Sequence, residues 1–204
     1  MQRMRTRYGL ILFKSVYRRD ARVNRRLFLA HAIALLTSPA VNAATNPNAF
    51  WEAPRHLHLR RQVKPGVWEE AGGVYFANGK VNEPVYEQLC RILRDVNTGK
   101  AVRMSVDLLD ILAGIEGWFL AHGIAIQMNV LSGFREVKTN EDAGGKKDSA
   151  HLRGGACDFY IPGISVYYLQ KVALYLEGGG VGIYPDHKQN FLHVDDGRIR
   201  VWKG

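Results

Sequence analysis

The sequence is poor in cysteine, with Cys90 and Cys157 as its only two among 204 residues. Cys90 falls inside a predicted helix, and on an alternating strand Cys157 points away from its neighbour Asp158. This placement predicts two buried free thiols, with a disulfide as the alternative in an exported protein. We do not count Cys157 among the candidate metal ligands.

Other signals are absent as well. The sequence has no internal repeats, no coiled-coil heptads and no phosphate-binding glycine motif, which excludes solenoids, long coiled coils and P-loop or dinucleotide-binding domains. Its longest signal-like apolar run, residues 27–36, is too short to span a bilayer unaided. An uncleaved membrane anchor is therefore the minor alternative for this segment.

The chain also has little net charge outside its first 43 residues. That stretch holds nine of the 28 lysines and arginines and a single acid, Asp20, so it carries +8 of the total net charge of +9. The remainder carries about +1, which gives no case for a nucleic-acid-binding surface on the main domain.

Residues 1–43 have the pattern of an export signal peptide. A basic stretch precedes the apolar run, and Val41-Asn42-Ala43 supplies small residues for cleavage near Ala43. The segment 24–29, Asn-Arg-Arg-Leu-Phe-Leu, resembles a twin-arginine signal. We expect the leader to engage the export machinery and the mature protein to act in the periplasm or cell envelope. Residues 44–54 read as a short tether, and residues 55–204 as one domain.

The domain reads as α+β, an antiparallel sheet with packed helices. Residues 56–60 and 67–76 predict a hairpin around Lys64-Pro65-Gly66. Helices are expected from Asn82 to about residues 97–99, from Ser105 to His122, and from Ser165 to Leu176. Strands are expected at residues 124–131, after the glycines at 154–155, at 181–184 and at 191–195, and residues 138–147 read as a mobile loop beside a cleft.

Two segments carry the candidate chemistry. The first runs from Ser149 to Tyr160 and contains His151 and Asp158, and the second is Phe191-Leu-His193-Val-Asp195. Two imidazoles and a carboxylate are the usual number and type of protein ligands for a catalytic zinc, which keeps its fourth position open. Alternation in the second segment places His193 and Asp195 on one strand face. His56 and His58 are expected to be surface histidines, because no third ligand lies nearby in sequence.

An arginine follows the predicted strand at 124–131. Ser132-Gly133-Phe134-Arg135 reads as a glycine turn that delivers Arg135, whose guanidinium suits a substrate carboxylate or a developing oxyanion. The arginine and the three ligands together indicate a metal-dependent hydrolytic site.

The motifs also resemble a known family. Ser132 to Arg135, Asn140, Ser149 to Asp158, residues 179–185 and Phe191 to Gly197 are similar to the zinc murein peptidases of the D-Ala-D-Ala carboxypeptidase type, and most similar to the MepK-type murein endopeptidases. The resemblance implies a hedgehog/DD-peptidase fold and one zinc ion held by His151, Asp158 and His193. It also implies cleavage of crosslinks between peptidoglycan peptide stems.

The resemblance does not identify the general base of the reaction. The carboxypeptidase branch has a glutamate three residues before its last histidine, where this chain has Asn190. Asp195 is the candidate base, and orientation of His193 is its alternative role. His187 belongs to a longer loop and is expected to be solvated.

The expected activity is metal-assisted amide hydrolysis, in which zinc activates water and polarises the scissile carbonyl. Ser149, Tyr184 and Trp202 are candidate substrate-binding residues. Two alternatives stay open. One is a carboxypeptidase that releases terminal D-Ala, and the other is a zinc-containing module that binds peptidoglycan without cutting it.

Overall fold

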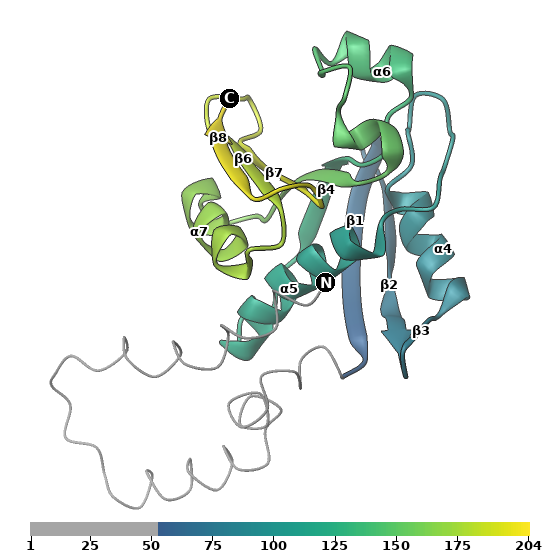
Figure 1. The fold of residues 1–204 in the computed structure, drawn as a ribbon, viewed down its shortest axis with the longest axis vertical. Coiled ribbons are helices and arrows are strands. Elements are labelled where there is room, and N and C mark those ends of the chain that lie inside the picture. Colours follow the sequence, from purple (N-terminus) through teal and green to yellow (C-terminus); the bar gives the residue numbers. More distant parts are fainter. Residues whose placement is uncertain (1–52) are drawn as a thin grey trace, which may run out of the picture. The chain divides into compact units, whose positions relative to one another are not determined.

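The computed structural model describes residues 53–204 (Figure 1). The predicted leader and nearly all of the tether lie outside the described residues. Residues 54–204 form one compact unit. Within the described part of the chain, no helix is both long and apolar enough to cross a membrane. The elements in order are β1 (Arg55–Lys64), β2 (Val67–Ala77), β3 (Lys80–Val81), α4 (Glu83–Ile92), α5 (Val106–Ala121), β4 (Met128–Ser132), α6 (Val137–Asp142), η1 (Ala150–Arg153), β5 (Ala156–Tyr160), α7 (Val166–Leu176), β6 (Gly180–Tyr184), β7 (Phe191–Asp195) and β8 (Arg200–Lys203).

The strands form one eight-stranded sheet in the order β3-β2-β1-β4-β5-β7-β6-β8. The prediction of an antiparallel sheet is only partly right, because β1 pairs with β4 and β6 pairs with β8 in parallel. Between β1 and β4 the chain passes through β2, β3, α4 and α5, and this crossover brings β4 beside β1 in the same direction. The fold is therefore a mixed sheet with packed helices.

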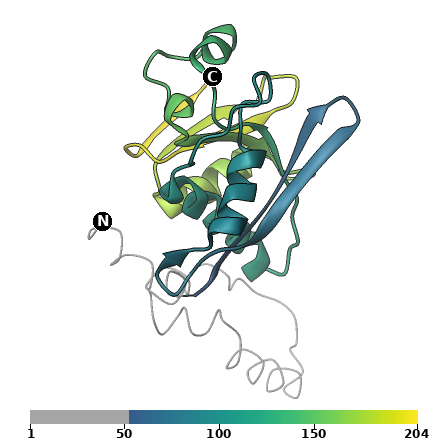
Figure 2. The same cartoon turned by 90° about the vertical axis from the view of Figure 1, so that its right-hand side faces the viewer.

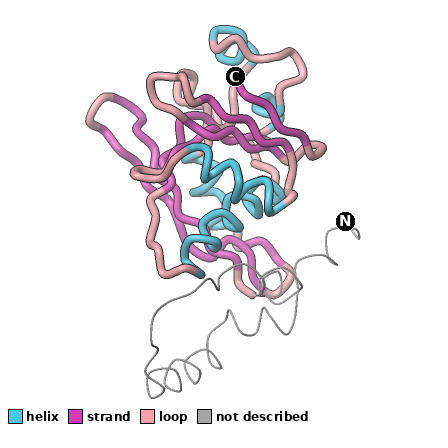
Figure 3. Tube along the Cα trace, turned by 90° about the vertical axis from the view of Figure 1, so that its left-hand side faces the viewer, coloured by secondary structure: helices cyan, strands magenta, loops and turns pink. Residues whose placement is uncertain are grey.

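The helices pack against the sheet and supply much of the core. Helix α5 is apolar on most sides, with nine buried residues, because it contacts both α7 and strands of the sheet. Helix α4 packs on β2, and α7 packs on β6. Figures 2 and 3 show the helices between the long β1–β2 hairpin and the C-terminal strands. This core fixes the positions of the strands that carry the polar site.

Several predicted elements have the expected bounds. The hairpin turns at residues 65–66, and the Ser105 side chain caps α5 by accepting a hydrogen bond from the Leu108 N–H. Strands β6 and β7 pair antiparallel, as expected. Both cysteines are buried and free, which confirms the prediction of two thiols.

Other predictions were wrong in extent or type. Helix α4 ends at Ile92 rather than at residues 97–99, and β4 begins at Met128 rather than at Ile124. Residues 137–142, part of the expected loop, form the short helix α6. Strand β8 was not predicted, since three of its four residues are exposed and give no clear apolar pattern.

Candidate metal centre

His151, Asp158 and His193 converge in the structure. They come from η1, β5 and β7, and one ligand atom from each lies within 4.8 Å of the others. Asp158 and His193 are directly opposite each other on β5 and β7, so their side chains are neighbours on the sheet. The structure therefore brings together the three residues that the sequence singled out.

Two of the three distances between the donor atoms fit a tetrahedral metal, and the third is that of a hydrogen bond. His151 Nε2 lies 3.3 Å from both His193 Nδ1 and Asp158 Oδ1, and His193 Nδ1 lies 2.7 Å from Asp158 Oδ1. Ligand atoms bound about 2.0–2.1 Å from a tetrahedral zinc lie about 3.3 Å from one another. Two imidazole nitrogens and one carboxylate oxygen are also a donor set that zinc accepts, so the residues fit the implied ion.

The direction of the His151 ring is set by its surroundings. The Ser149 side chain accepts a hydrogen bond from the His151 N–H, and Gly154 ends η1 in the left-handed conformation at a φ of 72°. His151 Nδ1 contacts the Gly133 carbonyl. Because a carbonyl can only accept, Nδ1 carries the proton and Nε2 presents its lone pair to the cluster.

Gly133 lies against the backbone of the segment after α4. A Cβ atom there would lie 2.3 Å from the Leu93 carbonyl oxygen, which also accepts a hydrogen bond of 2.7 Å from the Phe134 N–H. No side chain fits in this space. The absence of a side chain at Gly133 thus lets its carbonyl reach His151.

Arg135 points toward the metal cluster, as its position after this turn predicted. Its Nη2 donates to Asp158 Oδ2, and its Nε donates to Ser132 Oγ at 2.7 Å. The ion pair with Asp158 leaves Oδ1, the carboxylate oxygen nearest the two histidines, facing the cluster. Arg135 therefore orients a ligand in this structure.

Asp195 lies on the opposite edge of the His193 ring from the cluster. Its Oδ2 is 3.1 Å from His193 Nε2, whereas His193 Nδ1 faces Asp158. The carboxylate is fully buried and also accepts from the Gly197 N–H and from Arg200. Arg200 was not predicted as a site residue, because it belongs to strand β8, which has no clear apolar pattern in the sequence.

The charges of the cluster favour a cation. Burial alone would raise the pKa of Asp158, but the neighbouring imidazoles of His151 and His193 hold it well below its usual value. Burial opposes the charge on His193 as well, yet its hydrogen bonds to Asp158 and Asp195 raise its pKa to about 9. The ionised carboxylates of Asp158 and Asp195 thus stabilise a positive charge on His193.

Aromatic side chains lie beside His193. The Trp202 ring centre is 5.2 Å from that of His193, and Trp202 Nε1 donates to the Tyr184 hydroxyl at 3.2 Å. Tyr184 stacks on Phe191 at 4.5 Å, and the exposed His187 meets Phe191 edge-on. We call Trp202, Tyr184, Phe191 and His187 the aromatic wall. Phe191 was not among the predicted substrate-binding residues, although its alternation with His193 placed it on the same face.

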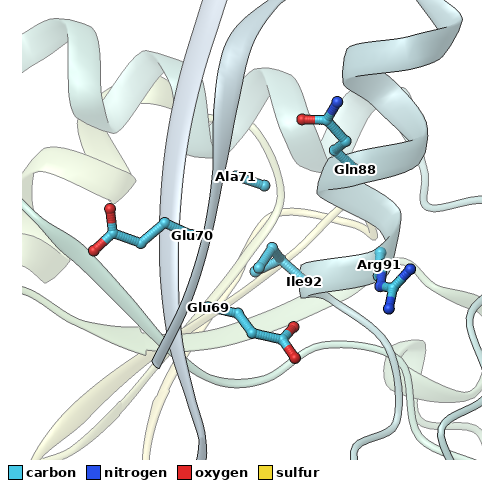
Figure 4. Close-up of a pocket in the computed structure, with 6 residues that line it drawn as sticks. All are labelled: Glu69, Glu70, Ala71, Gln88, Arg91 and Ile92. Atoms are coloured by element: carbon cyan, nitrogen blue, oxygen red, sulfur yellow. The ribbon is translucent and has the colours of Figure 1, made fainter. Parts of the chain in front are cut away.

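A hollow of about 350 Å³ between β2 and α4 lies away from the metal cluster. Figure 4 shows the residues that line it, with Glu69 and Glu70 pointing to opposite sides of β2. Glu69 is already paired with Arg94. The hollow holds none of the predicted site residues, and its lining includes no candidate nucleophile or metal cluster among the described residues.

Comparisons with known proteins identify the family of the chain. A family model described as peptidoglycan L,D-endopeptidase MepK matches residues 49–202. Peptidoglycan L,D-endopeptidase MepK of Escherichia coli (strain K12) is 30% identical over 189 residues, which cover 88% of this chain and 97% of the relative. The probable peptidoglycan L,D-endopeptidase MepK of Haemophilus influenzae is 29% identical over 181 residues, which cover 86% of this chain and 91% of the relative. The resemblance read from the motifs is confirmed, and the chain belongs to the peptidoglycan L,D-endopeptidase MepK family.

Proposed function

We propose that this protein is a zinc-dependent murein endopeptidase that hydrolyses peptide crosslinks in peptidoglycan. The observation that carries the proposal is the convergence of His151 Nε2, Asp158 Oδ1 and His193 Nδ1, which lie 2.7–3.3 Å from one another. Membership of the MepK family supports peptidoglycan as the substrate, and the relatives' names support an L,D bond as the one that is cut.

In this proposal His151, Asp158 and His193 hold one zinc ion. When bound, zinc supplies Lewis-acid activation of water and of the scissile carbonyl. The protein contributes the orientation of its ligands through the Gly133 carbonyl at His151 and through Arg135 at Asp158. The hedgehog/DD-peptidase fold implied by the motif resemblance belongs to the same proposal, and the mixed sheet with packed helices supports it.

Arg135 has a second part in the proposed reaction. Its bonds to Asp158 and Ser132 use Nε and one N–H of Nη2, so Nη1, with two N–H groups, is the nitrogen that these bonds leave entirely free to donate. A substrate carboxylate or a developing oxyanion beside Asp158 would accept from this donor. Peptidoglycan stems carry free carboxylates, which makes such a donor useful for binding them.

Of the two roles predicted for Asp195, the geometry favours orientation of His193. The carboxylate contacts His193 on the ring edge opposite the ligand atom, and it is fully buried. Both of its oxygens accept hydrogen bonds from other groups. A residue in this position fixes the ring and supports the basicity of the ligand nitrogen.

The aromatic wall is the proposed binding surface for the peptide stem. Trp202 and Tyr184 extend from the metal ligand His193 toward the β6–β7 loop, and their half-buried rings offer flat apolar surface. Ser149, the third candidate, caps η1 and supports His151 from that position.

Export belongs to the proposal as well. We assign residues 1–43 to a twin-arginine-like signal peptide, residues 44–54 to a tether, and residues 55–204 to a periplasmic peptidase domain. The basic and apolar pattern of residues 1–43 supports the signal peptide, and the peptidoglycan in the relatives' names supports the periplasmic location.

The test is digestion of purified crosslinked sacculi by the zinc-loaded protein, with mass analysis of the released muropeptides. We expect dimers joined through L,D bonds to disappear and monomers to increase. A chelator and His151→Ala should both abolish this change. His122→Ala, which alters an exposed histidine at the end of α5 outside both the ligand set and the aromatic wall, serves as the matched control and should keep the activity.

The other outcomes separate the alternatives. Release of D-Ala from unchanged dimers would indicate a carboxypeptidase. Retention of zinc and sacculi without any cleavage would indicate a binding module, and Asn190, which stands where the carboxypeptidase branch has its glutamate, would be the first residue to examine.

A further inference from the structure

Asp195 is the last residue of strand β7 and Asp196 follows it, and each forms a two-point ion pair with an arginine from another element. Asp195 binds Arg200 of β8, and Asp196 binds Arg153 of η1. The two ion pairs differ in the further contacts of their aspartates. Asp195 contacts the metal ligand His193, and this contact gives the first pair its interest.

The Arg200 guanidinium donates a hydrogen bond to each carboxylate oxygen of Asp195. Nη2 lies 2.7 Å from Oδ2, and Nη1 lies 3.0 Å from Oδ1. Oδ2 is also the atom that lies 3.1 Å from His193 Nε2. Arg200, Asp195 and His193 thus form a continuous line of contacts from β8 to the metal cluster.

The glycine at position 180 of the sheet leaves space for the contact between Arg200 and Asp195. Gly180 of β6 is paired with Asp195 on one side and with Arg200 on the other. A Cβ atom at Gly180 would lie 2.5 Å from Asp195 Oδ2 and 2.6 Å from Arg200 Nη1. Any side chain at Gly180 would therefore occupy the space in which the arginine meets the carboxylate.

The ion pair between Arg200 and Asp195 fixes the orientation of the His193 ring. A fully buried carboxylate requires donors, and a bidentate arginine fixes both its plane and its position. With Asp195 fixed, the hydrogen bond at Nε2 holds the His193 ring with Nδ1 toward Asp158. Without Arg200, the Gly197 N–H is the remaining backbone donor recorded for Asp195, and it binds Oδ1 rather than Oδ2.

We infer that Arg200 is a positioning residue of the metal centre, acting through Asp195 on His193. The inference rests on the proposed zinc site and adds a residue from a strand that supplies no ligand. Arg200 does not reach the cluster itself, so its effect on the ion passes through Asp195. Its guanidinium also lies 5.0 Å from the centre of the Trp202 ring, so zinc affinity rather than hydrolysis is the measurement that isolates this role.

The experiment measures zinc affinity of the purified full-length chain by competition with a chromophoric chelator. We expect Arg200→Gln to weaken zinc binding about tenfold, at the low end of the effect of partners that orient metal ligands. Asp195→Asn should weaken it at least as much. Because Arg200 acts through Asp195, the double variant should be no weaker than Asp195→Asn alone.

Two further variants keep the inference falsifiable. Arg198→Gln removes the same charge from an exposed position two residues away and should bind zinc like the wild type. Arg200→Lys keeps the charge but cannot span both oxygens, so it should recover only part of the affinity. It also replaces Arg200→Gln if that variant does not fold, as judged by circular dichroism.

Each outcome has a defined meaning. Wild-type affinity in folded Arg200→Gln, or additive losses in the double variant, would overturn the inference and leave the proposed function intact. A wild-type chain that binds no zinc would overturn the proposed function and the inference together. Tenfold weaker binding with non-additivity supports the line from Arg200 to His193.

Discussion

Two glycines at the metal centre have different neighbours, and this difference separates two functions of the site. A Cβ at Gly133 would meet the backbone oxygen of Leu93 at 2.3 Å, whereas a Cβ at Gly182 would meet the indole of Trp202 at 2.4 Å. A backbone segment in the core cannot move aside easily, but a half-buried indole can rotate. The same substitution is therefore expected to have different effects at the two positions.

We predict that Gly133→Ala lowers the free energy of unfolding by about 1–3 kcal/mol, the usual cost of overpacking. It should also weaken zinc binding, because the Gly133 carbonyl must move away from His151. Gly182→Ala should keep zinc binding and raise KM, because it displaces Trp202 from the aromatic wall. Urea denaturation, zinc titration and steady-state kinetics measure the three effects.

The two variants serve as controls for each other. Equal losses of zinc affinity at both positions would contradict the distinction between a ligand-orienting glycine and one that makes room for the aromatic wall. An unchanged KM in Gly182→Ala would contradict the proposed role of Trp202 in substrate binding.

At the residue scale, the convergence of the three candidate ligands could be predicted from the sequence, but the atoms that face one another could not. The alternation around His193 indicated the strand face, yet the choice of Nδ1 as the ligand atom depends on Asp195 at Nε2. The choice of Nε2 in His151 depends on the carbonyl of a residue 18 positions earlier. Such choices are made by tertiary contacts that no local pattern contains.

At the scale of elements, Asp95 links the segment after α4 to the beginning of α6. Its two carboxylate oxygens accept 2.9 Å hydrogen bonds from the N–H groups of Asn97 and Glu136, and Glu136 is the N-cap of α6. Arg135 immediately precedes that residue. Asp95 thereby helps to hold the turn that directs the arginine to the metal cluster.

The pKa of Asp95 gives this link a pH dependence. Burial raises the pKa, but hydrogen bonds from Thr139 and from backbone N–H groups outweigh burial and leave it below the usual value. A carboxyl with a depressed folded-state pKa contributes stability above its unfolded pKa of about 3.9 and loses it as pH falls through the folded value. Its contribution is therefore present at pH 7 and reduced at pH 3.

We predict that Asp95→Asn lowers the free energy of unfolding by about 1–3 kcal/mol at pH 7, because the new amide NH₂ faces a backbone donor. The loss should be smaller at pH 3, where part of the wild-type contribution is already gone. Urea denaturation at both pH values measures it. Asp142→Asn, on the exposed side of α6, is the control and should change stability little at either pH. A loss that is equal at pH 7 and pH 3 would contradict the assignment.

Elements with a strong apolar period were predictable, and those without one were not. The stripe of Leu108, Leu112 and Ile115 identified α5 together with its Ser105 cap. Helix α6 was missed because a polar, glycine-rich segment reads as a loop, and here Asp95 stabilises its start through a contact 41 residues away. Strand β8 was missed because its pairing with β6 is tertiary and parallel.

For the whole molecule, the order of the strands creates the candidate metal centre. β5, β7, β6 and β8 are consecutive in the sheet, so Asp158, His193, Gly182 and Trp202 follow one another across it. The antiparallel β6–β7 pair was foreseen from sequence, whereas the two parallel pairs depend on how the chain returns to the sheet. Two strand pairs, β1–β2 and β6–β7, could therefore be predicted, and the order of all eight strands could not.

Because η1, β5 and β7 each give one ligand, a bound ion would fasten a short helix to two central strands. Anything that binds the folded state alone stabilises it by mass action, by about 2.7 kcal/mol when free ligand is 100 times its Kd. For a domain of about 150 residues each kcal/mol shifts Tm by about 2–4 °C. We therefore predict that zinc at this excess raises Tm by about 5–10 °C, and that a chelator reverses the rise.

The ligand variants test whether this stabilisation comes from the predicted centre. In His151→Ala, zinc should leave Tm unchanged, because two ligands on neighbouring strands hold the ion much more weakly than three. His187→Ala changes an exposed histidine of the β6–β7 loop and should keep the full shift. Thermal melts of the wild type and both variants, each with zinc and with chelator, measure it. A shift that survives in His151→Ala would place the stabilising ion elsewhere in the chain, and the proposed link between η1 and the sheet would then be wrong.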